Sequence, residues 1–115
     1  MLPLIRLKQV YKITYPNGKI YVGMDLTGTV LYFGSPSAGQ QIADDHQADR
    51  NNFTFTIRKE ILWESETATD SEVRAKEIEL ILATGANNPA IGYNKAPKFK
   101  AADPPIQDLD RPSTV

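Results

Sequence analysis

The fold is decided by the stretch Val10-Tyr11-Lys12-Ile13-Thr14-Tyr15-Pro16-Asn17-Gly18-Lys19-Ile20-Tyr21-Val22-Gly23. Pro16-Asn17-Gly18 is a turn, because proline presets φ and because asparagine and glycine tolerate positive φ. The residues on either side predict two strands, from about Leu7 to Tyr15 and from Lys19 to Met24. The chain is therefore expected to begin with a β-hairpin that carries two tyrosines, Tyr11 and Tyr21.

The register of this hairpin is open between two alternatives that differ by one residue. A two-residue Asn17-Gly18 loop puts the two tyrosines on opposite faces of the hairpin. A three-residue loop that begins at Pro16, with Gly18 in a bulge, pairs Tyr11 with Gly23 and puts both phenols on one face. Since a slip of one residue moves every side chain to the other face, the register decides whether the phenols can act together.

Downstream of the hairpin, the sequence predicts a weak helix followed by a strand. Ser35 is expected as the N-cap and Pro36 as the first helical residue, with the helix itself running from about Ser37 to Asp49. Between Phe53 and Trp63 the apolar residues recur at every second position, which is typical of a strand. Lys59 is the one interruption on the apolar face of this strand.

A second helix carries a carboxylate on its apolar face. The capping box Thr69-x-x-Glu72 opens this helix, which is predicted from Asp70 to about Thr84, and Gly85 ends it. On a helical wheel of about 100° per residue, Glu77 falls among the apolar side chains that face the sheet. A carboxylate in that place is costly unless a cation, a metal ion or hydrogen-bond donors meet it. Glu77 is therefore either a partner in a structural salt bridge or tyrosine hydrogen bond, or a metal ligand or catalytic group.

The order β-β-α-β-α predicts one small α+β domain, in which a three-stranded antiparallel sheet is flanked by helices. A chain of 115 residues is long enough for one hydrophobic core but not for two. We expect the domain to occupy residues 1–96, with residues 91–94 as a last short extended piece. Residues 97–115 contain several prolines and few large apolar groups, and we expect them to form a flexible tail.

The composition excludes several classes of protein. The chain has no cysteine, so that disulfides and zinc sites built from cysteine are excluded. A net charge of −1 gives no general basic field, so any nucleic-acid binding must use a local patch. The apolar run at the N-terminus is too short for a signal peptide, and no later run is long enough to cross a bilayer. We therefore expect a cytoplasmic protein without a membrane partner.

Four short motifs are more specific in their order along the chain than any of them alone. The hairpin holds the triplets Val10-Tyr11-Lys12 and Tyr21-Val22-Gly23, the second helix holds Glu77-Ile78, and Gly92-Tyr93-Asn94 follows it. The two triplets resemble those that name the GIY-YIG nucleases. The third motif is similar to the catalytic helix of that family, and the fourth to the segment that often follows. The likeness covers roughly Val10 to Asn94, and it is to the catalytic domain standing alone.

The resemblance implies an endonuclease that hydrolyses phosphodiester bonds in DNA with one divalent ion, Mg²⁺ or Mn²⁺. Tyr11 and Tyr21 would lie at the scissile phosphate, where one phenol, or a water that it orients, takes part in the attack. Glu77 would hold the metal ion, which stabilises charge on the phosphate and the leaving oxygen. Asn94 would support the site through hydrogen bonds, and it counts with Gly23 among the residues expected to bind substrate. The likeness also favours the three-residue loop of the hairpin.

The chain departs from this family in its basic residues. The family usually places a basic residue after the second triplet and an arginine on the first helix, and here neither is present. Phosphoryl transfer needs positive charge besides the metal ion, so another residue must supply it. The catalytic candidates are His46 and Arg58, and Arg50, Lys12 and Lys19 are candidates for binding substrate. Each also has a structural reading, as a hydrogen-bonded histidine, a helix-end or cross-strand cation, or a solvated lysine.

Two other functions remain open at the level of the sequence. One is a catalytically impaired nuclease fold that binds nucleic acid or protein, which the missing arginine favours. The other is a small adaptor that docks on a partner through its proline-containing tail. For the nuclease, DNA is the expected substrate and RNA the alternative. Because the net charge is slightly negative, we expect a partner protein or a homo-oligomer to supply part of the affinity for substrate.

Overall fold

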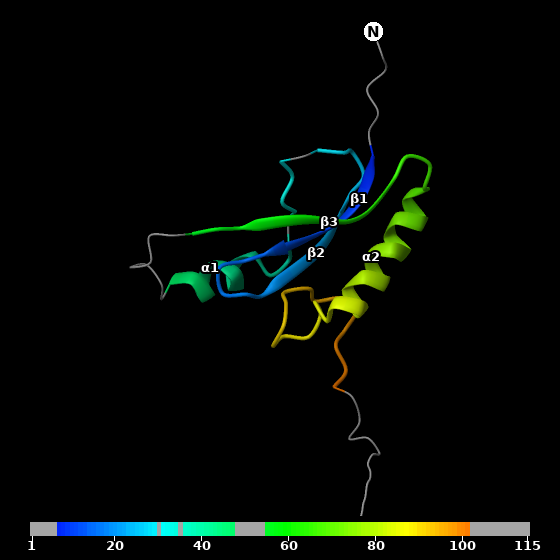
Figure 1. Cartoon of the computed structure of the whole chain (residues 1–115). Coiled ribbons are helices and arrows are strands. Elements are labelled where there is room, and N and C mark those ends of the chain that lie inside the picture. The colour runs from blue at the N-terminus through cyan, green and yellow to red at the C-terminus, as the bar shows by residue number, and fades with distance from the viewer. Residues whose placement is uncertain (1–6, 30, 35, 48–54, 102–115) are drawn as a thin grey trace, which may run out of the picture.

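A computed structural model describes residues 7–29, 31–34, 36–47 and 55–101 of the chain. The elements follow one another in the order β1 (Lys8–Thr14), β2 (Ile20–Asp25), α1 (Gly39–Gln47), β3 (Arg58–Ser65) and α2 (Asp70–Thr84) (Figure 1). The strands form one antiparallel sheet in the order β2-β1-β3, so that β1 is central. The predicted α+β class with a three-stranded antiparallel sheet is confirmed.

The hairpin of β1 and β2 adopts the register of the three-residue loop. Tyr11 pairs with Gly23, and Ile13 pairs with Tyr21. Gly18 has a φ of 86°, a left-handed conformation that glycine adopts without steric cost. Side chains two residues apart on a strand share a face, so Tyr11 and Tyr21 lie on the same side of the sheet. The alternative register with a two-residue loop is wrong.

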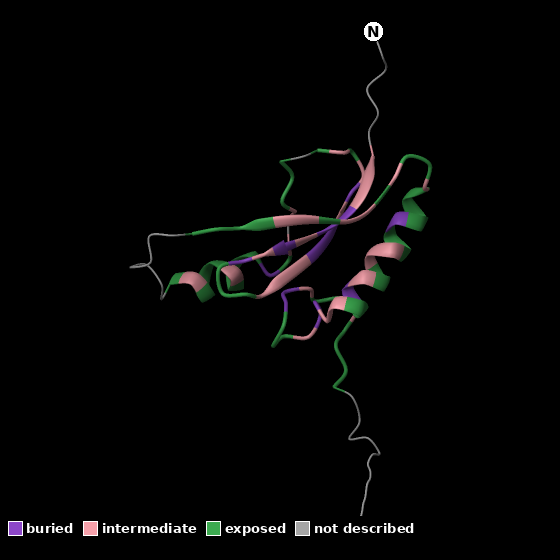
Figure 2. Ribbon diagram, in the orientation of Figure 1, coloured by how far each residue is buried: buried purple, intermediate pink, exposed green. Residues whose placement is uncertain are grey.

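Two apolar clusters lie on opposite faces of this sheet. On one face α2 packs against β1 and β2, and the buried residues are Val10, Val22, Val73, Ile81 and Ala86. We call the opposite side the tyrosine face, and its buried residues are Tyr11, Ile13, Tyr15, Ala38 and Tyr93. Figure 2 shows buried positions on both β1 and β2 and, on α2, only at separate points. The hairpin thus supplies buried side chains to both cores.

A register shift in β3 sends the end of this strand to the α2 side. Tyr11 pairs with Ile61, but the preceding residue, Val10, pairs with Trp63, so that Leu62 is an extra residue in the ladder. Trp63 consequently packs on the cluster beneath α2. The prediction of one apolar face that continues to Trp63 is therefore wrong at its C-terminal end.

Two predicted elements begin later than the sequence suggested. α1 begins at Gly39, because the Pro36 carbonyl accepts a hydrogen bond from Gly39 N at 3.1 Å and the proline lies in a turn before the helix. Residues 55–57 precede β3 without belonging to the strand. The remaining predicted end points, Ser35, Asp49 and Phe53, lie outside the described residues.

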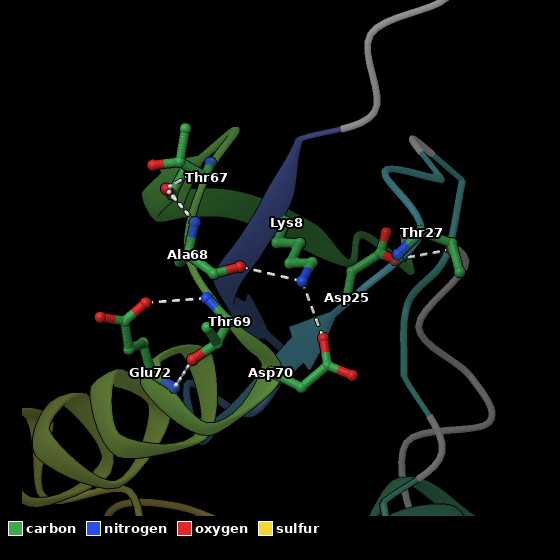
Figure 3. Close-up of polar contacts among 9 residues, drawn as sticks. Lys8, Asp25, Thr27, Thr67, Ala68, Thr69, Asp70 and Glu72 are labelled. Atoms are coloured by element: carbon green, nitrogen blue, oxygen red, sulfur yellow. Dashed lines mark hydrogen bonds and ion pairs between the residues drawn. The ribbon is translucent and has the colours of Figure 1, made fainter.

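The second helix has the predicted bounds. The Thr69 hydroxyl accepts from Glu72 N at 3.2 Å, and the Glu72 carboxylate accepts from Thr69 N at 2.8 Å, which completes the capping box (Figure 3). Gly85 ends the helix with a φ of 75°. Lys8 joins this helix to the central strand, since its Nζ donates to the Ala68 carbonyl at 2.9 Å and to the helix's first residue at 2.8 Å. These contacts fix where α2 begins against the sheet.

The segment after α2 lies beside β2. Gly92 forms an isolated parallel bridge with Ile20, so the short extended piece predicted for residues 91–94 pairs with the sheet at this one residue. The Asn87 side chain donates to the Pro97 carbonyl at 2.8 Å, and the part of the predicted tail from residue 102 onward lies outside the described residues. Within the described ranges, no helix is long and apolar enough to cross a membrane.

Candidate functional site

The two tyrosines of the hairpin meet where glycines leave room for them. A Cβ at Gly23 would overlap the Tyr11 hydroxyl and lie 2.7 Å from Cζ of the same ring. A Cβ at Gly34 would lie 2.6 Å from Tyr11 Oη and 2.8 Å from Cε2 of Tyr21. The Tyr11 ring therefore crosses the backbone of β2 at Gly23, and the Gly34 backbone lies against both phenol rings. Tyr32 adds an edge-on contact, with its ring centroid 6.1 Å from that of Tyr11.

Both phenols keep their protons at neutral pH. Burial raises the pKa of Tyr11 far above its ordinary value, and the neighbouring Tyr21 and Tyr32 raise it further. Burial and then the Glu77 carboxylate raise the pKa of Tyr21 to about 12. Neither hydroxyl has a hydrogen-bond partner among the described residues. The pair therefore presents two O–H groups that can donate to a ligand.

Glu77 is half-buried and lies close enough to both phenols to act on their pKa values. Burial raises the pKa of its carboxyl, and the Arg74 guanidinium, one turn earlier on α2, lowers it. In the described part of the chain, the carboxylate makes neither a hydrogen bond nor an ion pair within 4.0 Å. The structural salt bridge or tyrosine hydrogen bond that the sequence left open is thus not present there.

A single inward carboxylate is enough for one kind of metal site. The described residues contain no group of three histidine, cysteine or acidic side chains that could hold a metal ion. Mg²⁺ is usually bound by one or two carboxylates together with waters and substrate phosphates. Glu77 makes no hydrogen bond or ion pair in the described part of the chain and raises the pKa of both phenols, so it fits that mode and would be the protein ligand.

A second carboxylate near Tyr11, that of Asp25, is taken up by hydrogen bonds within the fold. Asp25 accepts hydrogen bonds from Thr27 N at 2.8 Å, Gly28 N at 3.1 Å and Thr29 N at 2.8 Å, and its contact with Thr27 is drawn in Figure 3. Burial alone would raise the pKa of Asp25, but these hydrogen bonds outweigh burial and lower the pKa below its usual value. Asp25 therefore stays ionised and fixes the loop after β2.

Lys59 supplies a positive charge beside Tyr11. Its Nζ lies 4.8 Å from the centroid of the Tyr11 ring and 5.8 Å from that of Phe33. It donates to the Tyr32 carbonyl at 2.6 Å, and the Thr29 carbonyl lies 3.5 Å away. Sequence reasoning noted this lysine as an interruption of an apolar face and did not count it among the cations of the site. The signal that could have identified Lys59 is a charged residue among the apolar positions of a strand. The same kind of signal, on a helix, identified Glu77.

The cations that the sequence did propose lie elsewhere or outside the described residues. His46 is on α1, with its ring centroid 6.2 Å from that of Tyr15 and 5.5 Å from that of Phe55. Arg58 is exposed at the start of β3, and its Nη2 lies 3.4 Å from the Glu60 carboxylate. Arg50 falls in a range that the structure does not describe.

The two lysines that flank the tyrosines in the sequence have other contacts. Lys12 forms an ion pair with Glu60 at 3.3 Å. Strand alternation places it on the side opposite to Tyr11. Lys19 lies over the Tyr93 ring, 5.4 Å from its centroid. Neither contact brings an ammonium group to the phenol pair.

Asn94 holds the edge strand between the two site positions of β2. Its Oδ1 accepts from Val22 N at 2.8 Å and its Nδ2 donates to the Val22 carbonyl at 2.8 Å. Val22 lies between Tyr21 and Gly23, so Asn94 fixes the backbone that carries both. This hydrogen-bonded support agrees with the role that the sequence suggested for Asn94.

Comparison with known proteins gives no relative for this chain. No family model matches it, and searches of curated proteins and of solved structures find no match.

Proposed function

We propose that the chain is a divalent-metal-dependent endonuclease that hydrolyses phosphodiester bonds in DNA. The observation that carries the proposal is that Tyr11 and Tyr21 share one face at Gly34 and that the Glu77 carboxylate raises the pKa of both phenols, while none of the three side chains has a hydrogen-bond partner among the described residues. Their oxygen atoms are not closed off from solvent, so a ligand can reach them. Two donors and one carboxylate suit a phosphate diester and the cation that accompanies it.

The proposal includes membership of the GIY-YIG family. The hairpin register supports it, because that register is the one the resemblance favoured, and it places both tyrosines on one face. The position of Glu77 supports it as well, since the carboxylate of the later helix influences both phenols. Lys59 fills the place of the missing basic residue in electrostatic terms, although it comes from β3 rather than from the first helix.

The residues divide the work of hydrolysis as follows. The attack joins a water oxygen to phosphorus and the bond from phosphorus to the leaving oxygen breaks, while the water releases a proton to solvent and the leaving oxygen takes one up. Tyr11 and Tyr21, which remain protonated, donate hydrogen bonds to phosphate oxygens and orient the attacking water. Lys59 adds positive charge next to the Tyr11 phenol. Glu77 would hold the metal ion, which when bound stabilises negative charge on the phosphate and on the leaving oxygen.

Cleavage of supercoiled plasmid with Mg²⁺ or Mn²⁺, and with EDTA as the metal-free control, tests the proposal. Glu77→Ala and Tyr21→Phe should each reduce the rate about 10²-fold or more, because each removes a group that acts only on the reacting phosphate. The matched control is Glu79→Ala on the same helix, whose exposed carboxylate pairs with Lys76 at 3.1 Å. Cleavage that persists in EDTA, or equal rates for the Glu77 and Glu79 variants, would contradict the proposal.

A second candidate is a nucleic-acid binding module that has lost cleavage. The observation that favours it concerns Lys59, whose Nζ donates to backbone carbonyls. This lysine therefore contributes to the fold as well as to the charge of the site. This candidate predicts that wild-type protein binds DNA without nicking it in either metal. It also predicts that Glu77→Ala leaves that binding unchanged.

A further inference from the structure

A pocket of about 320 Å³ lies on the tyrosine face, at Tyr15 and α1. Its walls include Tyr15, Ile42, His46, Phe55 and Ile57, so that three of them are aromatic rings. The volume is near the lower end of the roughly 300–1,000 Å³ that is usual for ligand sites. The pocket is therefore suited to one small planar group rather than to an extended ligand.

His46, which lines this pocket, has an acceptor atom without a hydrogen-bond partner among the described residues. Its Nδ1 lies 2.7 Å from the Ile42 carbonyl, and because a carbonyl can only accept, Nδ1 carries the hydrogen. In the neutral ring Nε2 is then a bare acceptor, and it is buried without a hydrogen-bond partner among the described residues. A ligand with an N–H group would satisfy it. Every nucleobase has such a donor on the edge that it uses for base pairing.

The rings around His46 leave a face open for stacking. Phe55 is 60 % exposed, and its ring meets that of His46 at 5.5 Å between centroids with an angle of 73°. Aromatic side chains that are exposed in this manner stack on unpaired bases whatever the base, because every base has a π-face. Bases inside a duplex cannot reach such a pocket, since they are stacked and paired.

The pocket belongs to the same face as the proposed cleavage site. Tyr15 lies in one buried cluster with Tyr11, against which the partly buried Tyr21 packs, and it contributes to the raised pKa of Tyr21. A base in the pocket would therefore be close to a phosphate at Tyr21.

A second pocket, of about 390 Å³, lies on the other side of Lys59 and is lined by Gln9, Leu31, Phe33, Lys59 and Ile61. It repeats the same arrangement of apolar walls and an acceptor, because Gln9 Oε1 is buried without a described partner. Ile57, just before β3, lines the first pocket, and Ile61, within β3, lines the second, and both side chains are exposed. Lys59 lies between Ile57 and Ile61 in the sequence. If a single-stranded nucleic acid placed one base in each pocket, the phosphate between those bases would lie near Lys59.

We infer that this face binds unpaired nucleotides, with one nucleobase held between Tyr15, Phe55 and His46 and hydrogen-bonded to His46 Nε2. The inference rests on the proposed function and narrows its substrate to single-stranded DNA or DNA with an unpaired segment.

The test measures binding with cleavage switched off by EDTA. The probes are a single-stranded deoxyoligonucleotide that contains 2-aminopurine, the same strand in a duplex, and the same strand with abasic sites. The full wild-type chain should bind the single strand at least about 10-fold more tightly than the duplex, and should quench the 2-aminopurine fluorescence on stacking. Phe55→Ala should weaken this binding about 5- to 150-fold, the usual effect of losing one stacked base.

His46→Phe keeps a ring in the pocket and removes the acceptor. It should weaken binding of the intact strand several-fold and leave binding of the abasic strand unchanged. Phe99→Ala, at an exposed phenylalanine that lines a different pocket, is the matched control and should have no effect. Because Phe55 is exposed, its variant is expected to fold even if the histidine variant does not.

The outcomes separate this inference from the proposed function. Preference for the single strand, lost in Phe55→Ala, supports the inference even if no metal-dependent cleavage is found, which would contradict the proposed function alone. Metal-dependent cleavage with equal affinity for duplex and single strand, unaffected in both pocket variants, would overturn the inference and leave the proposed function standing. Tighter binding of an RNA strand than of the DNA strand would overturn the assignment to DNA.

Discussion

Replacing Gly23 by alanine should disturb the fold and the candidate site at one point. A methyl group there would overlap the Tyr11 hydroxyl and come within 2.7 Å of Cζ, and that ring is only 1 % exposed and cannot swing away into solvent. Overpacking of this kind costs about 1–3 kcal/mol. The overlap can be relieved only if the Tyr11 ring moves, and the Tyr11 hydroxyl then leaves its position in the site.

Gly39→Ala separates this effect from the general effect of removing a glycine. A Cβ at Gly39 would meet nothing within 4 Å, and its φ is not in the left-handed region. Both substitutions restrict the unfolded chain to a similar degree, which stabilises by about 0.4–1 kcal/mol, so this contribution largely cancels in the comparison. The two variants should therefore differ in unfolding free energy by about 1–3 kcal/mol.

Urea unfolding followed by the fluorescence of Trp63, the one tryptophan of the chain, measures this difference. With an m-value of about 2 kcal/mol per molar urea, the two midpoints should lie roughly 1 M apart. In a Tyr11→Phe background the nearest overlapping atom is gone, and the cost of Gly23→Ala should fall. Equal midpoints for the two glycine variants, or a cost that does not change in the phenylalanine background, would refute the packing described for this pair.

Two further predictions concern the support of the site. Glu77→Gln should raise stability at pH 7, because burial raises the pKa of the Glu77 carboxyl and its ionised form is unfavourable in the folded state. This gain should shrink as the pH falls and the wild-type carboxyl becomes protonated. Urea midpoints measured against pH test this, and the control Glu79→Gln should show no such gain. Asn94→Ala should cost about 1–3 kcal/mol, because it leaves both backbone groups of Val22 without partners, and the Val22 amide should exchange faster in hydrogen-exchange measurements; unchanged exchange would contradict the role given to Asn94.

Local rules were sufficient for the second helix. Its N-cap, its capping box and its left-handed end residue act within a few positions of each other, so Thr69, Glu72 and Gly85 fix the bounds without reference to the rest of the fold. The inward direction of Glu77 followed from the helical period alone. The finding that Glu77 makes no hydrogen bond or ion pair with the described residues did not follow from that period, because it depends on how far the helix lies from the side chains of the sheet.

The sheet shows where local rules end. Two hairpin registers satisfied the turn residues, and choosing between them needed either a family resemblance or the structure, since the choice depends on which face can pack. The register shift at Leu62 left no mark in the alternation of apolar residues, so Trp63 was assigned to the wrong face. Lys59 was missed for a related reason: its contacts are with a loop some 30 positions earlier in the chain, such as Thr29.

The candidate site and the hydrophobic core share side chains, and this decides how the chemistry can be probed. Tyr11 belongs to a buried cluster, so its replacement by alanine would cost about 3–5 kcal/mol, a large part of the stability of a small domain. A loss of cleavage in that variant would report unfolding as readily as chemistry. Tyrosine to phenylalanine keeps the ring and removes one hydroxyl that has no described partner, so the packing is retained. If Tyr11→Phe and Tyr21→Phe keep the wild-type urea midpoint and lose cleavage, the phenol oxygens act on the substrate; if they keep cleavage, the rings serve the core alone.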